Sequence, residues 1–233
     1  MSTRGTASVI EIVGPAGSGK TAVAAQMCTR TGMRTVSSIS SAESRRRRLV
    51  AGGRAMPEAL RLLARGRPTR QQTAWLARLV ALESVAWRAN DDVLVLDQGP
   101  LYTISRLLAA RPDCAGDIWV ASRTQRWAGL LDAVVVLDAP DEVLVERIRS
   151  RPKDHSVKAS CDAEALAAVA RQRAEIEVVV GAVEVQGLRV LRCRTDHMSV
   201  EEIADDATVS AARGRHVTAL GSTITTDEPA DSP

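Results

Sequence analysis

The chain has 233 residues, of which 45% are hydrophobic and 25% are charged, and its formal net charge is +3 at pH 7. These proportions argue against a wholly disordered or fibrous chain, and the length favours a single domain. The sequence contains neither a transmembrane stretch of about 18 to 20 apolar residues nor a signal-peptide hydrophobic region of the usual length. We therefore expect a soluble, cytoplasmic protein.

Aromatic side chains are scarce, since the chain has 4 Trp, 1 Tyr and no Phe. This predicts an aliphatic core with few platforms for base stacking, which argues against a nucleic-acid partner. The four cysteines are far apart and form no C-x-x-C pair. The pattern therefore predicts reduced thiols and no metal cluster, with Cys28 and Cys193 as small core residues.

Short apolar runs alternate with longer segments of helical periodicity from residue 8 onwards. The predicted strands are residues 8–13, 34–39, 93–96, 133–137 and 188–193. The predicted helices begin at residue 22, at Pro57 and near residue 69, and continue with 101–110, 116–130, 140–151, 162–181 and 199–212. This alternation predicts an α/β fold in which a parallel sheet carries helices on both faces and binds ligands at the carboxyl ends of its strands. We expect residues 1–213 to form one domain and residues 214–233, rich in Ser, Thr, Asp and Pro, to form a disordered tail.

Residues 14–21 (GPAGSGKT) match the pattern G-x-x-x-x-G-K-[ST] between the first predicted strand and helix. The backbone N–H groups of such a loop surround phosphate oxygens, and the dipole of the following helix favours an anion there. Lys20 is expected to reach the β- and γ-phosphates, and Thr21 to hold Mg²⁺ through its hydroxyl. The alternative is a glycine turn with a purely structural role. The predicted phosphate-binding residues are Gly14, Pro15, Ala16, Gly17, Ser18, Gly19, Lys20 and Thr21.

Asp97 closes the apolar run VLVL at residues 93–96. A carboxylate at the end of that strand would lie beside the phosphate loop, where it could bind Mg²⁺ through water or accept a proton from an acceptor hydroxyl. The alternative is that Asp97 caps the helix that begins near Leu101. Asp138 closes the next strand along the chain, but the Ala-Pro-Asp that follows favours a role in the turn.

Basic residues gather at the end of the helix 140–151 and in the polar segment 151–161, which we interpret as a candidate lid. Arg147 and Arg151 are four residues apart and share a helix face, so we predict that both stabilise charge during phosphoryl transfer. Arg149 lies on another face, and a solvated helix end explains it equally well.

Other charged residues have less definite roles. Lysine is rare, with only Lys20, Lys153 and Lys158 among the 31 basic residues, and the last two flank the candidate lid. The run Arg45–Arg48 either holds an anionic acceptor or forms a solvated face. His155, a lone histidine in the lid segment, is interpreted as a bystander.

The chain resembles the P-loop kinases of the nucleoside-monophosphate-kinase type, which include thymidylate and shikimate kinases. The matching pieces are GPAGSGKT, VLVLDQG and VVVLDAPDEVLVERIRSR, and together they span most of residues 8–160. The resemblance implies a three-layer fold with a five-stranded core, ATP with Mg²⁺ as cofactors, and Arg147 and Arg151 on the donor phosphates. It does not name the acceptor.

One residue departs from the thymidylate-kinase pattern, because Gln98 follows Asp97 where an arginine is common. Glutamine cannot neutralise an acceptor phosphate, so the acceptor is either a nucleotide or a hydroxylated metabolite. We predict Mg²⁺-dependent transfer of the ATP γ-phosphoryl group to such a small molecule, with Lys20, Asp97, Arg147 and Arg151 as catalytic residues and Thr21 and Asp97 at the metal.

Two other functions compete with this prediction. The first is a regulatory ATPase or nucleotide switch, although the N-K-x-D of GTPases and the L-S-G-G-Q of transporter ATPases are both absent. The second is a nucleic-acid end kinase, which the scarcity of aromatic residues disfavours.

Overall fold

Five parallel strands form one sheet in the order β2-β3-β1-β4-β5. The computed structural model describes residues 8–31, 34–35, 69–88, 93–110, 118–152 and 154–220. The strands are β1 (Ser8–Val13), β2 (Arg34–Thr35), β3 (Val93–Asp97), β4 (Ala133–Asp138) and β5 (Val190–Arg194). Because β1 lies between β3 and β4, the loop that follows β1 emerges between the carboxyl ends of two neighbouring strands. Parallel sheets bind their ligands at this edge.

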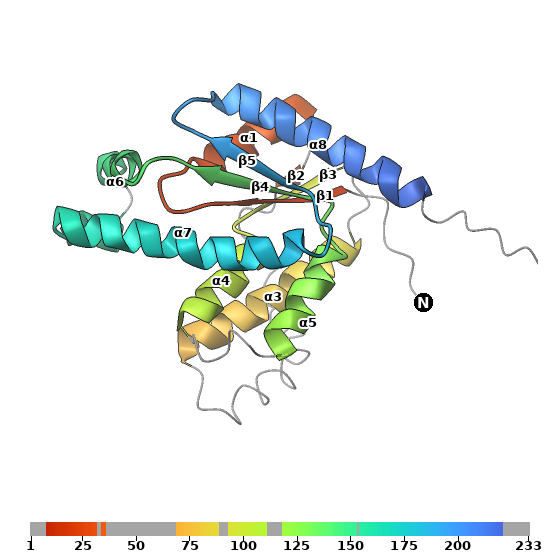
Figure 1. Ribbon diagram of the computed structural model, residues 1–233, viewed down its shortest axis with the longest axis horizontal. Helices are drawn as coiled ribbons and strands as arrows, with labels where there is room; N and C mark the ends of the chain where they lie inside the picture. The colour runs from red at the N-terminus through yellow and green to blue at the C-terminus, as the bar shows by residue number, and fades with distance from the viewer. Residues whose placement is uncertain are drawn as a thin grey trace, which may run out of the picture.

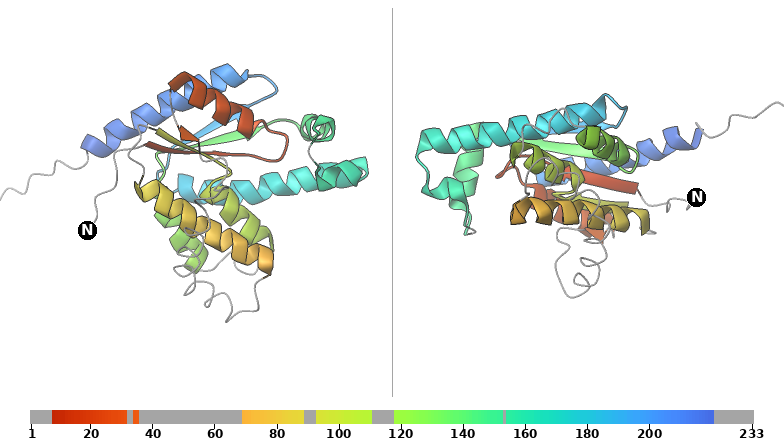
Figure 2. Two further views of the ribbon diagram at one scale, coloured as in Figure 1. Left: turned by 180° about the vertical axis from the view of Figure 1, so that it is seen from behind. Right: turned by 90° about the horizontal axis from the view of Figure 1, so that it is seen from below.

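Helices cover both faces of the sheet, as Figures 1 and 2 show. Helices α1 and α8 pack on one face, and α3, α4, α5 and α7 pack on the other. Helix α6 lies beyond the carboxyl ends of the strands, next to the first turns of α7 (Figure 1). The helices are α1 (Lys20–Thr31), α3 (Arg70–Arg88), α4 (Pro100–Ala110), α5 (Ile118–Ala128), α6 (Asp141–Ser150), α7 (Asp162–Glu184) and α8 (Val200–Leu220), with a short 3-10 helix η2 (Ser156–Ala159) between α6 and α7.

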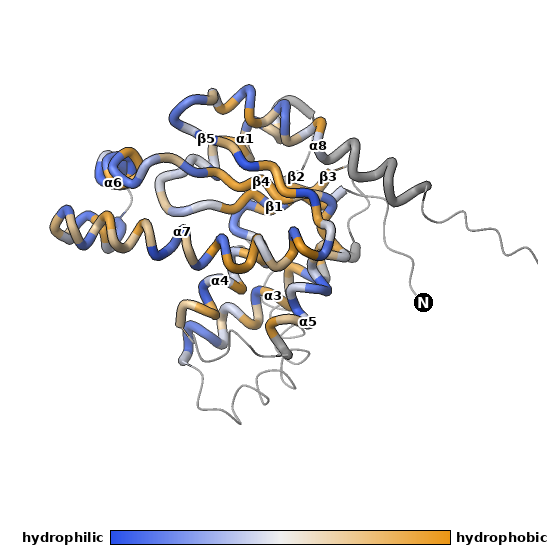
Figure 3. Tube along the Cα trace, viewed as in Figure 1, coloured by the Kyte–Doolittle hydropathy of each residue, from blue (hydrophilic) through white to orange (hydrophobic). Residues whose placement is uncertain are grey.

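Alternate residues of each strand enter two separate cores. In β1, Val9 and Val13 pack with the helices of the four-helix face, whereas Ile10 and Ile12 pack against α1 and α8. Strand β4 consequently appears as a mostly apolar segment in the middle of the molecule (Figure 3). The described cores are built almost wholly from aliphatic residues, as predicted, and Trp127 is the one fully buried aromatic residue among them.

The predicted α/β fold with helices on both faces is confirmed, and the bounds of two elements differ clearly from the prediction. Strand β2 has only two residues in the structure. Helix α8 continues through Gly214 to Leu220, beyond the end predicted for the helix 199–212. A single interior glycine costs a helix only about 1 kcal/mol and does not end it where the flanking residues are helix formers. The predicted helix at Pro57 and the run Arg45–Arg48 lie outside the described residues.

Within the described part of the chain, no helix combines the length and the apolar character that a membrane crossing requires.

Candidate functional site

The loop between β1 and α1 requires glycine at two positions because neighbouring backbone approaches it closely. A Cβ on Gly14 would lie 2.2 Å from the carbonyl oxygen of Leu137, at the end of β4. Gly17 has a φ of +90°, and a Cβ there would lie 2.6 Å from the carbonyl oxygen of Leu144 in α6. The loop is therefore pressed against β4 and α6 in a shape that residues with side chains cannot adopt.

Lys20, the first residue of α1, folds back into this loop. Its Nζ donates hydrogen bonds to the carbonyl oxygens of Gly14 and Pro15, both at 2.7 Å, and only 7% of the residue is exposed. Burial lowers the Lys20 pKa to about 8, although nearby Asp97 acts to raise it, and Arg151 lowers it further. An anion bound in the loop would favour the charged ammonium, so phosphate and Lys20 stabilise each other.

Thr21 and Asp97 join the phosphate loop to the end of β3. The Thr21 hydroxyl donates a hydrogen bond of 2.8 Å to Asp97 Oδ2. Asp97 is only 5% exposed, and its other oxygen, Oδ1, is buried without a hydrogen-bond partner. A buried carboxylate oxygen without a partner is costly unless something binds it. Asp97 is one of the two residues at which the sequence predicts Mg²⁺.

These two side chains fit a magnesium ion by the chemistry of their donors. Mg²⁺ prefers oxygen ligands and is commonly held by one or two carboxylate or hydroxyl groups together with water and phosphate oxygens. With the Thr21 proton directed at Asp97, the hydroxyl lone pairs stay available to a cation. Among the described residues there is no cluster of three or more His, Cys, Asp or Glu side chains that could hold a metal by itself. An ion here would therefore need the phosphates of a nucleotide.

A pocket of about 270 Å³ opens on the other side of the phosphate loop. Charged and apolar side chains share its walls, which are formed by the loop, the end of α6 and the segment from β5 to α8. Arg147 is fixed in one wall because its guanidinium donates to the hydroxyl and the carbonyl oxygen of Thr195, at 2.8 and 2.9 Å. The lining residues are Gly17, Ser18, Gly19, Val23, Arg147, Ser150, Arg151, Thr195, Met198, Val200 and Ile203.

The predicted lid segment 151–161 is an ordered connection between α6 and α7. Lys158 donates to the carbonyl oxygen of Arg151, and Arg149 donates to the side chain of Asp162 and the carbonyl oxygen of Ser160. The imidazole of His155 accepts a hydrogen bond from the backbone N–H of Val157 and so caps η2. Lys153 lies outside the described residues.

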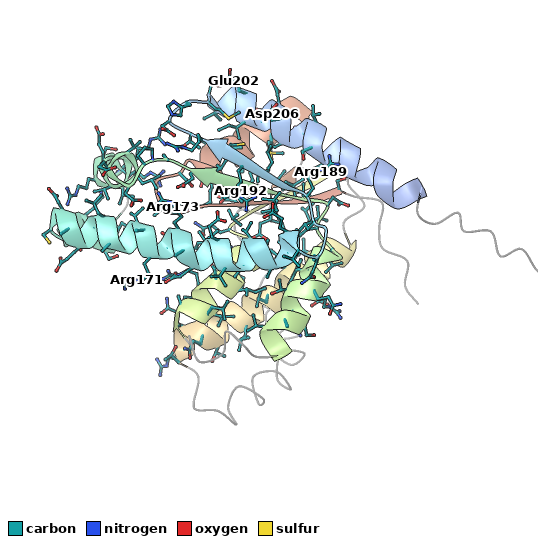
Figure 4. All side chains as sticks on the ribbon, in the orientation of Figure 1. Arg171, Arg173, Arg189, Arg192, Glu202 and Asp206 are labelled. Carbon is teal, nitrogen blue, oxygen red and sulfur yellow. The ribbon has the colours of Figure 1, made fainter. Side chains whose placement is uncertain are left out.

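Helix α7 contacts the phosphate loop from the side opposite α1. The Ala16 N–H donates to Gln172 Oε1 at 3.0 Å, and Arg173 donates from Nε to both carboxylate oxygens of Asp138. Figure 4 shows Arg173 between α7 and the sheet, whereas Arg171 points away from the sheet. Asp138, the last residue of β4, is thus held in an ion pair with α7.

Comparisons with known proteins give a family and a fold. Residues 9–176 match the family model described as an AAA domain. The chain belongs to the AAA domain family. No curated protein matches the chain.

Solved structures similar to this AAA-domain chain include three with low sequence identity. Deoxyadenosine kinase from M. mycoides with bound dCTP has a TM-score of 0.51 and 13% identity, over 88% of this chain and 99% of that one. The YorR protein from Bacillus subtilis in complex with phosphorylated GDP has a TM-score of 0.50 and 16% identity, over 90% and 98%. A gluconokinase from Sinorhizobium meliloti 1021 has a TM-score of 0.47 and 19% identity, over 94% and 99%. The first two show that this chain has the fold of a P-loop kinase of the nucleoside-monophosphate-kinase type.

Most residues that the sequence singled out lie together in this AAA-domain chain. The phosphate loop, Thr21 and Asp97 form one cluster, and Arg147 and Arg151 line the adjoining pocket, while Arg149 turns away from it. Of the predicted small core residues, Cys193 is buried and Cys28 is partly buried, and Cys28, Cys161 and Cys193 are free thiols.

Several residues of the site escape prediction from sequence. Arg78 and Thr195 belong to no motif and reach the site only through the packing of α3 and the end of β5. Gln172 lies in the middle of α7, far along the chain from the loop that it contacts. Glu11 was not predicted either, although one charged residue in the apolar strand SVIEIV was a visible signal.

Proposed function

We propose that this chain is a Mg²⁺-dependent phosphotransferase that moves the γ-phosphoryl group of ATP to a hydroxyl or phosphate of a small molecule. The observation that carries the proposal is Asp97. Its Oδ2 accepts the Thr21 hydroxyl beside the phosphate loop, and its buried Oδ1 has no hydrogen-bond partner. A carboxylate in this position can serve both a metal and an acceptor group.

The donor nucleotide is assigned to the loop and the pocket beside it. The loop amides and Lys20 would bind the phosphates, and the base would enter the pocket between Val23, Met198 and Ile203. Arg147 and Arg151 stand on the wall between these parts, where their charge can offset charge that develops on the transferred group. This arrangement supports a nucleoside triphosphate as the donor.

Asp97 would act on the acceptor. The attacking oxygen forms a bond to the γ-phosphorus while the bond from that phosphorus to the β–γ bridging oxygen breaks, and ADP leaves. For a hydroxyl acceptor, the departing proton passes to Asp97 Oδ1, the oxygen that Thr21 leaves unused. Mg²⁺ held near Thr21 and Asp97 would supply charge neutralisation on the phosphates.

The test is transfer of labelled γ-phosphate from ATP and Mg²⁺ to a panel of nucleosides, nucleoside monophosphates, sugars and antibiotics. A labelled product that depends on one acceptor and is lost in Lys20→Met supports the proposal. Release of inorganic phosphate alone, whatever acceptor is added, would overturn it in favour of an ATPase. Intact ATP binding without any transfer across the panel would count against it in the same way.

A further inference from the structure

The turn that carries Asp97 into α4 has an unusual backbone. Gln98, the residue after Asp97, has a φ of +57°, which few residues with a Cβ adopt. Gly99 follows it, and α4 begins at Pro100. Such a conformation persists only where surrounding contacts fix it, and it concentrates at functional sites. Two ionisable side chains from distant parts of the chain supply those contacts.

The first contact comes from Arg78 in α3. Its guanidinium donates a hydrogen bond of 2.7 Å to the carbonyl oxygen of Gln98. The Nε of Arg78 is buried without a hydrogen-bond partner, so the guanidinium lies inside the protein at the turn, where its charge also acts on Glu11. The sequence has Gln98 in place of an arginine and therefore indicated no cation at this turn. Arg78 supplies one from α3.

The second contact comes from Glu11 in β1, which is fully buried. Its two carboxylate oxygens accept hydrogen bonds from the backbone N–H groups of Leu101, at 2.9 Å, and Tyr102, at 3.0 Å. These are free amides at the start of α4, and the cap position Gly99 has no side chain of its own to bind them. A Cβ on Gly99 would lie 2.8 Å from the carboxyl carbon of Glu11.

A carboxylate at this position is costly, because the strand neighbours on its face, Val9 and Val13, enter an apolar core. Burial raises the Glu11 pKa to about 8 against the opposing effects of the Tyr102 and Leu101 amides and the Arg78 charge. Through its hydrogen bonds, Glu11 connects β1, which leads into the phosphate loop, to α4, the helix that follows Asp97. In the sheet, Ile12 of β1 pairs with Asp97 of β3, and this pairing fixes the backbone of Asp97.

We propose that Glu11 and Arg78 are positioning residues that hold the turn after Asp97, so that Asp97 faces Thr21 and a nucleotide-bound Mg²⁺. This rests on the proposed function in one respect, namely that Asp97 serves the metal of a bound nucleotide. Neither Glu11 nor Arg78 touches the nucleotide or the metal. They act through the backbone of residues 98–102.

The experiment compares ATP binding by calorimetry with Mg²⁺ and with EDTA in place of Mg²⁺. The quantity of interest is the gain in ATP affinity that Mg²⁺ provides. In Arg78→Met and Glu11→Gln we expect this gain to fall about tenfold, as is common when groups that orient a metal ligand are removed. ATP affinity in EDTA, which depends on the loop amides and Lys20, should stay within about twofold of the wild type.

A matched control removes another arginine that contacts α3 away from the turn. Arg126 in α5 pairs with Glu83 of α3, and Arg126→Ala should keep the full Mg²⁺ gain. A merely structural role for Arg78 would lower the melting temperature and weaken ATP binding equally with and without Mg²⁺. Arg78→Lys, which restores one cationic donor, should recover part of the gain.

An unchanged Mg²⁺ gain in folded Arg78→Met would overturn the inference, and this variant decides the matter if Glu11→Gln does not fold. Equal loss in Arg126→Ala would overturn it as well. These outcomes leave the proposed function standing as long as the wild-type chain binds ATP more tightly with Mg²⁺. A wild type that binds no ATP, or gains nothing from Mg²⁺, would instead refute the proposed function and this inference with it.

Discussion

The two halves of the nucleotide site are held in different ways. The phosphate loop makes its central contact within itself, because Lys20 bonds to the carbonyl oxygens of Gly14 and Pro15 only a few residues away, and α6 and α7 add remote contacts to it. The turn after Asp97 is held by side chains from other elements, Arg78 from α3 and Glu11 from β1. A local motif can be recognised in a sequence, whereas a set of contacts between remote residues becomes visible only in the fold.

The largest effect is expected from removing the central side chain of the loop. Lys20→Met should reduce phosphoryl transfer by at least about a hundredfold, since a charge that stabilises the transition state is lost. The melting temperature should not fall, because the variant also removes a buried ammonium whose pKa burial lowers to about 8. Steady-state kinetics and thermal unfolding measure the two effects. A large loss of stability would show that Lys20 is mainly a structural residue.

Two loop glycines allow the local character of this half to be tested by a matched pair. Gly17 and Gly19 have similar φ values, +90° and +86°, but only at Gly17 would a Cβ meet neighbouring atoms. Gly19→Ala should therefore lower the free energy of unfolding by about 1 to 2 kcal/mol, the cost of the left-handed conformation. Gly17→Ala should lower it by clearly more, because its Cβ would lie against the backbone of Leu144.

Urea denaturation of the two variants measures the difference. If both lose the same stability, then the contact between the loop and α6 is not rigid and does not help to fix the shape of the loop.

The contrast between local and remote contacts determines which parts of the site could be predicted from the sequence. The bounds of β1 and the loop follow from local patterns, since β-branched residues precede a glycine-rich motif. Asp97 is predictable too, because the carboxyl ends of parallel strands meet at one edge. The two-residue β2 and the η2 turn in the lid segment carry weak local signals. Arg78, Thr195 and Gln172 reach the site through the packing of helices and strands, and helix periodicity marks which residues are buried but not which charged residue meets which backbone group.

The turn after Asp97, which remote side chains hold, should make the free energy of unfolding depend on pH. Burial raises the Glu11 pKa to about 8, so between pH 4.5 and 8 the folded carboxyl keeps a proton that the unfolded chain has lost. Stability from this group is therefore complete below the unfolded pKa and is lost as the pH rises toward 8, at a limiting rate of about 1.4 kcal/mol per pH unit.

Glu11→Gln removes the titrating group and should flatten this slope. Urea denaturation at several pH values from 5 to 8.5 makes the comparison between the variant and the wild type. Equal slopes in both proteins would mean that other groups cause the dependence and that Glu11 is ionised throughout the range.

The smallest effect is expected in the pocket wall, where local and remote contacts both contribute. Arg147 in α6 and Arg151 directly after it both line the pocket, which follows from their closeness in sequence, but Arg147 takes its position from Thr195, the residue after β5. Loss of either arginine should weaken ATP binding about five- to tenfold, the value of roughly one ordinary net hydrogen bond. Arg149→Ala is the matched control, because Arg149 bonds to Asp162 and Ser160 outside the pocket and should leave ATP affinity unchanged. Thr195→Val separates the two contributions. If it weakens ATP binding as much as Arg147→Ala does, the remote contact sets the arginine's position, and if it has no effect, the spacing along α6 is sufficient.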